Sequence, residues 1–90
     1  MKYEIFKKKE IPDSPGVYRF IGRNKKILYI GKATSLRDRL KSYFSRGISL
    51  TRGVHIAQMI EESSAITWQT TDSVLEALVL EAYLIRKFQP

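Results

Sequence analysis

Two short stretches of β-branched and aromatic residues, at 17–21 and 27–30, constrain the fold of this chain most strongly. A polar turn over residues 22–25 lies between them. Such stretches are typical of β-strands, and so short a polar connection predicts that the two strands pair as an antiparallel hairpin. We expect the second strand to end at Gly31, where glycine would let a backbone or a phosphate approach closely.

The rest of the sequence predicts one more strand and three helices. An alternation of apolar and polar residues at 66–69 indicates the third strand, half buried. Apolar residues at helical spacing predict helices over about 35–44, 52–62 and 74–88. The last helix begins with a capping box at 73–76. Strands mixed with helices predict an α+β domain in which helices flank a small sheet that is at least partly antiparallel.

Length and composition limit the classes of protein to which the chain can belong. Ninety residues form one domain, over 1–90, and leave no room for a second. The absence of cysteine excludes disulfides and thiolate metal sites, and it fits a reducing cytoplasm. No apolar run approaches the roughly 20 residues that span a bilayer, so we expect no membrane partner.

The charge balance points to a polyanionic partner. Sixteen basic residues stand against nine acidic ones, which gives a net charge of +7. A basic surplus on a small domain is typical of nucleic-acid binding. The alternative is a basic protein without such a partner, and charge by itself does not decide between the two.

Glu81 is the most informative single residue. On the predicted last helix it lies opposite the arc that carries most of the polar side chains, between four apolar residues: Val74, Ala77, Ile85 and Phe88. A carboxylate among apolar neighbours is unfavourable unless something pairs with it. Two readings stay open: a salt bridge to a buried arginine, or a metal ligand or catalytic acid that faces a cleft.

Four other residues could take part in chemistry. Arg39 flanks the apolar stripe of its helix, where it could reach a phosphate, pair with Glu81, or extend into solvent. Tyr18 and Tyr29 lie on the two paired strands and could equally be core aromatics. Lys32 follows Gly31 directly and supplies a point charge.

The order and spacing of several motifs resemble the GIY-YIG nuclease family. The segments 16–18 and 29–31 match the two halves of its signature, on adjacent strands. Segments 12–18 and 76–82 are similar to the UvrC branch of that family, and the resemblance covers about 11–90. It implies a three-stranded antiparallel sheet flanked by helices, and hydrolysis of a DNA strand with one Mg²⁺ or Mn²⁺ ion.

The resemblance also implies roles for particular residues. The metal-binding glutamate of the family falls on Glu81, its active-site tyrosines on Tyr18 and Tyr29, its lysine on Lys32 and its arginine on Arg39. One carboxylate suffices, because Mg²⁺ keeps several waters. Tyr18 would orient or deprotonate the attacking water with help from Lys32 or the metal. Tyr29 would hold the water or Tyr18, and Arg39 would bind the charge that develops on the phosphate.

The same resemblance implies partners and a setting. It implies DNA as substrate, a monomer for the isolated domain, and a complex of the protein UvrB with DNA as the partner in a full-length protein. There the domain would make the incision 3′ of a lesion. Two alternatives stay open: a stand-alone nuclease of the family, and a module of the same fold that binds DNA without cutting it.

The sequence departs from the family pattern at two places. The pattern continues past its final proline to a tyrosine and an asparagine, whereas this sequence stops at Pro90. We therefore expect a fragment of a longer protein, whose full activity depends on the missing asparagine. Tyr83 stands where UvrC proteins often carry an asparagine.

Overall fold

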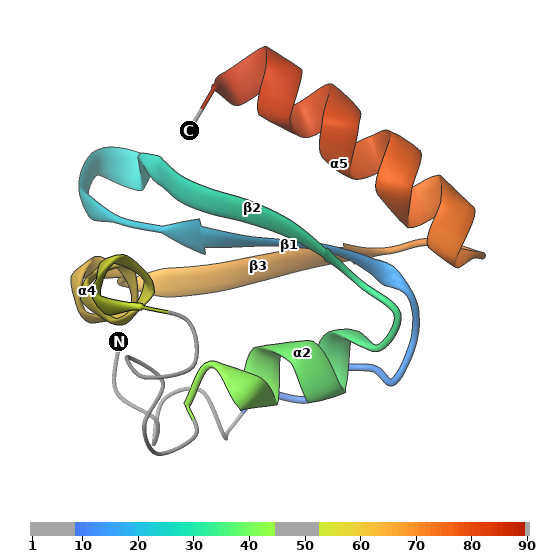
Figure 1. Ribbon diagram of the computed structural model, residues 1–90, viewed down its shortest axis with the longest axis horizontal. Coiled ribbons are helices and arrows are strands. Elements are labelled where there is room, and N and C mark those ends of the chain that lie inside the picture. The colour runs from blue at the N-terminus through green and yellow to red at the C-terminus, as the bar shows by residue number, and fades with distance from the viewer. Residues whose placement is uncertain (1–8, 45–52, 90) are drawn as a thin grey trace.

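A three-stranded antiparallel sheet forms the centre of the molecule (Figure 1). The structure, a computed structural model, describes residues 9–44 and 53–89. The strands are β1 (Gly16–Ile21), β2 (Ile27–Ala33) and β3 (Ala65–Thr70), in the spatial order β2-β1-β3. The α+β class and the three antiparallel strands are as predicted.

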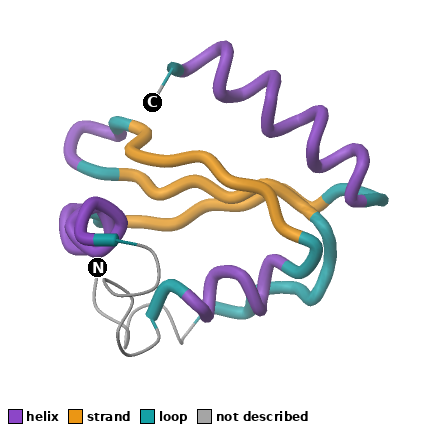
Figure 2. Tube along the Cα trace, in the orientation of Figure 1, coloured by secondary structure: helices purple, strands orange, loops and turns teal. Residues whose placement is uncertain are grey.

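Within the described residues, three α-helices flank this sheet, and Figures 1 and 2 show that they cover both of its faces. They are α2 (Leu36–Ser42), α4 (Val54–Glu62) and α5 (Val74–Phe88). The helices α2 and α4 lie on one face and α5 crosses the other. The start of the second helix, predicted near residue 52, falls outside the described residues. None of the helices in the described ranges is long and apolar enough to cross a membrane.

The turn that joins β1 to β2 has a defined backbone conformation. A short 3₁₀ helix, η1 (Arg23–Lys25), connects them. Asn24 and Lys25 both adopt left-handed backbone conformations, with φ of 56° and 58°. Asparagine tolerates this region better than most residues, because its short polar side chain can bond locally.

The strand β2 continues to Ala33, so the prediction that it ends at Gly31 is wrong. Gly31 pairs with Tyr18 of β1 inside the ladder. A Cβ atom on Gly31 would collide with the ring and the hydroxyl of Tyr18. The glycine therefore accommodates a neighbouring aromatic side chain and does not interrupt the strand.

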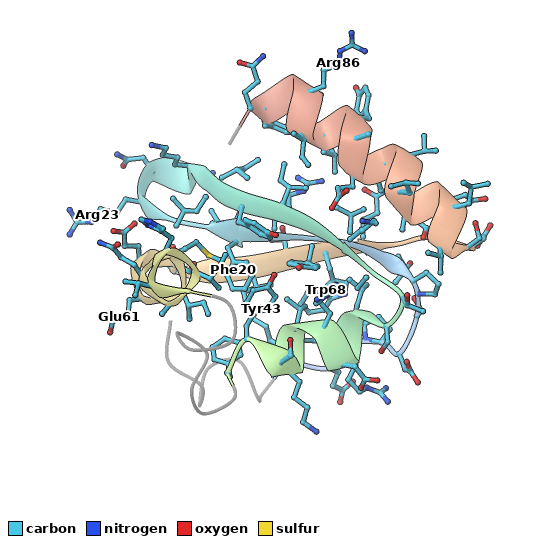
Figure 3. All side chains as sticks on the ribbon, viewed as in Figure 1. Phe20, Arg23, Tyr43, Glu61, Trp68 and Arg86 are labelled. Carbon is cyan, nitrogen blue, oxygen red and sulfur yellow. The ribbon has the colours of Figure 1, made fainter. Side chains whose placement is uncertain are left out.

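The buried apolar residues of the two described ranges form two clusters, one on each face of the sheet. The larger cluster packs β1 against α2 and α4, and its most deeply buried members are Tyr18, Phe20, Leu36, Leu40 and Tyr43. Figure 3 shows Phe20 and Tyr43 in this layer. The smaller cluster joins the sheet to α5 and consists of Val17, Ile30, Ala77 and Leu84. Alternate residues of β1 thus serve opposite layers, as the period of two requires.

The helix α5 begins and ends where the sequence predicts. The Ser73 hydroxyl accepts a hydrogen bond from the Glu76 N–H at 3.1 Å, and the Glu76 carboxylate accepts one from the Asp72 N–H at 3.2 Å. Gln89, with φ 46°, stops the helix in a left-handed conformation. The Ser73 hydroxyl thus satisfies a donor that the first turn of a helix leaves free, whereas the Glu76 carboxylate binds the N–H of Asp72, which lies before the helix.

The expected apolar surroundings of Glu81 are only partly present. Ala77 is fully buried, but Val74, Ile85 and Phe88 are exposed by 44%, 42% and 43%. The sheet contacts the helix along Ala77 and Leu84, and this contact sets which side faces inward. Apolar residues stand on the outer side as well, so the pattern alone did not define the inner stripe.

Candidate functional site

The strand β2 contributes two candidate residues, and they lie on opposite faces of the sheet. Tyr29 packs against the cluster that α2 and α4 cover. Lys32 is three residues further along and reaches α5. Residues separated by an odd number along a strand point to opposite faces. The predicted site residues therefore form two groups, joined by the edge strand β2.

Three tyrosines form the first group. The hydroxyls of Tyr18 and Tyr43 are 2.5 Å apart and share a hydrogen bond. The ring of Tyr29 lies 6.3 Å from that of Tyr18 and 6.5 Å from that of Tyr43, between centroids. Tyr18 and Tyr43 are almost completely buried, whereas Tyr29 is only half-buried. Of the three hydroxyl-bearing side chains, Tyr29 is the one that reaches solvent.

Tyr43 is a member of this group that the sequence argument missed. At helical spacing, its position in the sequence is that of one more apolar residue on the inner face of the predicted helix. In the structure it follows α2 directly and turns its hydroxyl toward Tyr18. The available signal was a phenol in place of an aliphatic residue on the buried stripe, because a buried tyrosine hydroxyl needs a hydrogen-bond partner.

Tyr18 holds its proton tightly. Burial raises the pKa of Tyr18 far above the ordinary value of about 10, and the hydrogen bond with Tyr43 raises it further. The positive charge of Arg39 acts in the opposite direction on the same pKa, without overcoming the burial. In the free domain Tyr18 is a neutral phenol, which can orient a neighbour but has no tendency to act as a base.

Arg39 connects the tyrosine group to solvent. It is exposed on α2, and its charge is close enough to affect Tyr18. The serine before the helix, Ser35, accepts a hydrogen bond from the Asp38 N–H at 3.2 Å and fixes where α2 starts. An exposed guanidinium beside buried phenols can receive an anionic oxygen through its planar set of donors.

Lys32 and Glu81 form the second group. The ammonium nitrogen of Lys32 lies 3.9 Å from Oε1 of Glu81. The side chain of Glu81 is 19% exposed and that of Lys32 is 44% exposed. At this distance the contact is an attraction between charges and not a hydrogen bond. The partner of the carboxylate is thus a half-exposed lysine of β2, not the buried arginine that one reading of the sequence considered.

The chemistry of Glu81 fits a hard cation such as Mg²⁺. The described residues contain no cluster of three or more histidine, cysteine, aspartate or glutamate side chains. A cation at Glu81 would therefore take most of its ligands from water and substrate, which Mg²⁺ readily accepts. The carboxylate is also partly buried and already attracts a positive charge, that of Lys32.

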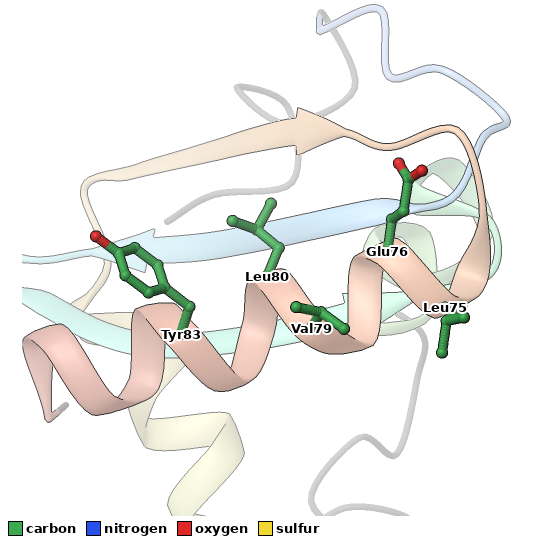
Figure 4. A pocket seen from close by; sticks show the side chains of 5 residues that line it. All are labelled: Leu75, Glu76, Val79, Leu80 and Tyr83. Carbon is green, nitrogen blue, oxygen red and sulfur yellow. The ribbon is translucent and has the colours of Figure 1, made fainter.

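A shallow hollow on the other flank of α5 does not belong to these groups. Its lining is almost entirely apolar: Leu75, Glu76, Val79, Leu80 and Tyr83 (Figure 4). The glutamate that borders it is Glu76, whose carboxylate accepts a hydrogen bond from the Asp72 N–H. None of the five candidate residues lines this hollow.

Comparisons with known proteins give a family match over most of the chain. The family model of the UvrC-like GIY-YIG domain matches residues 14–90. The UvrABC system protein C of a Synechocystis strain is 47% identical over 81 residues, and that of Tropheryma whipplei strain Twist is 46% identical over 81 residues. Both alignments cover 90% of this chain but only 13% of the relative. The chain thus spans about an eighth of the length of these proteins.

Solved structures give the same result for the fold. One is the GIY-YIG N-terminal endonuclease domain of UvrC from Thermotoga maritima, bound to magnesium as its catalytic divalent cation. It is 35% identical, with a TM-score of 0.82 over 100% of this chain and 96% of that one. A tyrosine-to-phenylalanine mutant of the same domain has a TM-score of 0.84 at 34% identity, over 100% and 94%. This chain belongs to the family of UvrC-like GIY-YIG domains.

Proposed function

We propose that this chain is an endonuclease domain that hydrolyses one phosphodiester bond of DNA with one divalent metal ion, Mg²⁺ or Mn²⁺. We assign it the 3′ incision of nucleotide excision repair. The observation that carries the proposal is the pairing of Glu81 with Lys32 beside an edge strand that also holds Tyr29. A structural relative at 35% identity is described with a catalytic magnesium ion.

Glu81 is the residue that would hold the metal. A bound divalent ion supplies Lewis acidity at the phosphate and balances the charge of the leaving oxygen. The remaining work belongs to side chains of the domain. Lys32, half-exposed beside Glu81, offers a point charge to a phosphate oxygen. Arg39, exposed on α2, offers a fork of donors to the charge that develops in the transition state.

The tyrosines share the task of orientation. Tyr18 and Tyr43 bond to each other in the core, and the pair fixes the packing against which Tyr29 lies. Tyr29 is only half-buried, so we assign to it the contact with the attacking water. Tyr18 supports that contact as a neutral phenol, because burial raises its pKa.

The partners follow from charge and from the relatives. A net charge of +7 favours DNA, whose phosphates release counterions when basic side chains replace them. The relatives are UvrABC system proteins C, so we infer that a longer protein of this kind would act on a complex of UvrB with DNA. The setting would be the cytoplasm, and we expect the isolated domain to be a monomer.

The test compares two glutamates of one helix. Glu81→Gln removes the charge of the proposed metal ligand, whereas Glu76→Gln removes an equal charge from the first turn of the same helix and serves as the matched control. Each variant is tested in a chimaera, in which this chain replaces the N-terminal domain of a full-length UvrC. Incision of damaged DNA by the chimaera is measured with Mg²⁺. We expect Glu81→Gln to lose at least about 10²-fold in rate, and Glu76→Gln to cut normally.

The same experiment distinguishes the proposed nuclease from the second candidate function, a module that binds DNA without cutting it. Such a module would show salt-dependent DNA binding but no incision in the unsubstituted chimaera. Incision that Glu81→Gln leaves intact would mean that the metal is held elsewhere. Normal cutting by Glu76→Gln together with loss in Glu81→Gln supports the proposed nuclease.

A further inference from the structure

We propose that Lys32 couples DNA binding to metal binding. Its ammonium group lies beside the Glu81 carboxylate in the free domain and moves to a phosphate when DNA binds. The inference deepens the proposed function and rests on it. In the free domain, the ammonium of Lys32 lies 3.9 Å from the Glu81 carboxylate. The same carboxylate is the proposed metal ligand, so two cations compete for one negative charge.

The competition follows from the geometry of the pair. Glu81 is mostly covered, with 19% of its side chain exposed, so a charge next to it is less screened than one in open water. A divalent cation on this carboxylate would repel an ammonium that stays at 3.9 Å. Lys32 therefore weakens metal binding for as long as it remains beside Glu81.

Lys32 is able to leave. Its side chain is 44% exposed, and the contact with Glu81 is too long for a hydrogen bond. A flexible four-carbon stem carries the ammonium, which is an ordinary ligand for phosphate. When a DNA phosphate takes up Lys32, the carboxylate is left with an unbalanced charge and binds the metal more strongly. By reciprocity, the metal strengthens DNA binding through Lys32 to the same degree.

Three other cations of the described residues have contacts of their own. The guanidinium of Arg19, on β1, lies 5.9 Å from the ring centre of Phe88. The ammonium of Lys87 lies over the rings of Tyr83 and Phe88. Arg39 acts on the tyrosine group across the sheet. Lys32 is the cation for which the structure shows a contact with Glu81.

The experiment measures metal affinity and not activity. Mn²⁺ is titrated into the 90-residue chain and followed by electron paramagnetic resonance, with and without a short DNA duplex. The variants are Lys32→Met and the matched control Lys41→Met, which removes an equal charge from an exposed position on α2. Thermal melting checks that each variant is folded, and a gel checks that the DNA remains uncut.

Without DNA, we expect Lys32→Met to bind Mn²⁺ about two- to fivefold more tightly than the unsubstituted chain, which is the range that a partly exposed ion pair contributes. Lys41→Met should bind like the unsubstituted chain. With DNA bound, the advantage of Lys32→Met should disappear, because the phosphate has already removed Lys32 from Glu81.

Two results would overturn the coupling. One is unchanged or weaker Mn²⁺ binding by Lys32→Met in the absence of DNA, and the other is an advantage of equal size when DNA is present. Glu81→Gln separates this failure from failure of the proposed function. If Glu81→Gln abolishes Mn²⁺ binding while Lys32→Met fails to tighten it, only the coupling is wrong. If Glu81→Gln leaves Mn²⁺ affinity unchanged, the metal site itself is wrong.

Discussion

The side chain of Tyr18 occupies the space beside Gly31 on the neighbouring strand, where a Cβ atom of any other residue would lie. The glycine of the second signature motif thus makes room for the tyrosine of the first. This contact joins the two motifs physically, and it holds the Tyr18 hydroxyl in the core where Tyr43 meets it.

Gly31→Ala should destabilise the fold by about 1–3 kcal/mol, because overpacking of a well-filled core has that typical effect. Urea denaturation of the variant measures it. A double-mutant cycle with Tyr18→Leu, which removes the ring, identifies the cause. If Gly31→Ala is equally harmful with leucine at position 18, the collision with Tyr18 is not the reason.

Tyr18 should make the fold sensitive to alkali. Its pKa in the folded state is raised above the unfolded value of about 10, chiefly by burial. Below pH 10 both states keep the proton, and this contribution to stability is fully present. Above pH 10 the unfolded state loses the proton first, so stability falls by up to about 1.4 kcal/mol per pH unit.

Urea denaturation between pH 8 and 11 checks this alkaline slope. Tyr18→Phe should have a shallower slope than the unsubstituted chain, because phenylalanine has no proton to lose. Tyr83→Phe is the control, since residue Tyr83 is 56% exposed. Equal slopes for all three proteins would contradict a tightly held proton on Tyr18.

Arg39→Lys should reduce incision strongly although the charge is kept. Lysine lacks the planar fork of donors, and loss of one contact made in the transition state typically lowers the rate by about 10²–10³-fold. The chimaera with full-length UvrC is the assay, and Arg37→Lys on the same helix is the control. An unchanged rate would show that Arg39 is an ordinary surface residue.

DNA binding by the isolated chain should weaken steeply as salt rises. Each phosphate that a basic side chain neutralises adds about −0.9 to the slope of log affinity against log salt. Fluorescence anisotropy with a labelled duplex, at several salt concentrations, gives the slope. A flat response between low and physiological ionic strength would remove the electrostatic basis for DNA as the partner.

Local patterns in the sequence were sufficient for the family and for most of the secondary structure, although not for the end of β2. Strand residues flanking a polar turn predicted the hairpin, and the capping box at Ser73 predicted where α5 begins. Both features depend on residues close together in the chain, which is why a sequence can reveal them. The motif order around Gly16 and Gly31 likewise needed no structure, and the family match confirms it.

Packing between distant segments decided which site residues meet and which side of α5 is buried. Only the structure places Tyr43 against Tyr18 and pairs Lys32 with Glu81 across two elements. Residues 25 and 49 positions apart in the chain meet there because strands and helices pack face to face, and no local period encodes such a meeting. The inner side of α5 was similarly undetermined, because apolar residues such as Leu75 also stand on its outer side and only contact with the sheet selects the buried stripe.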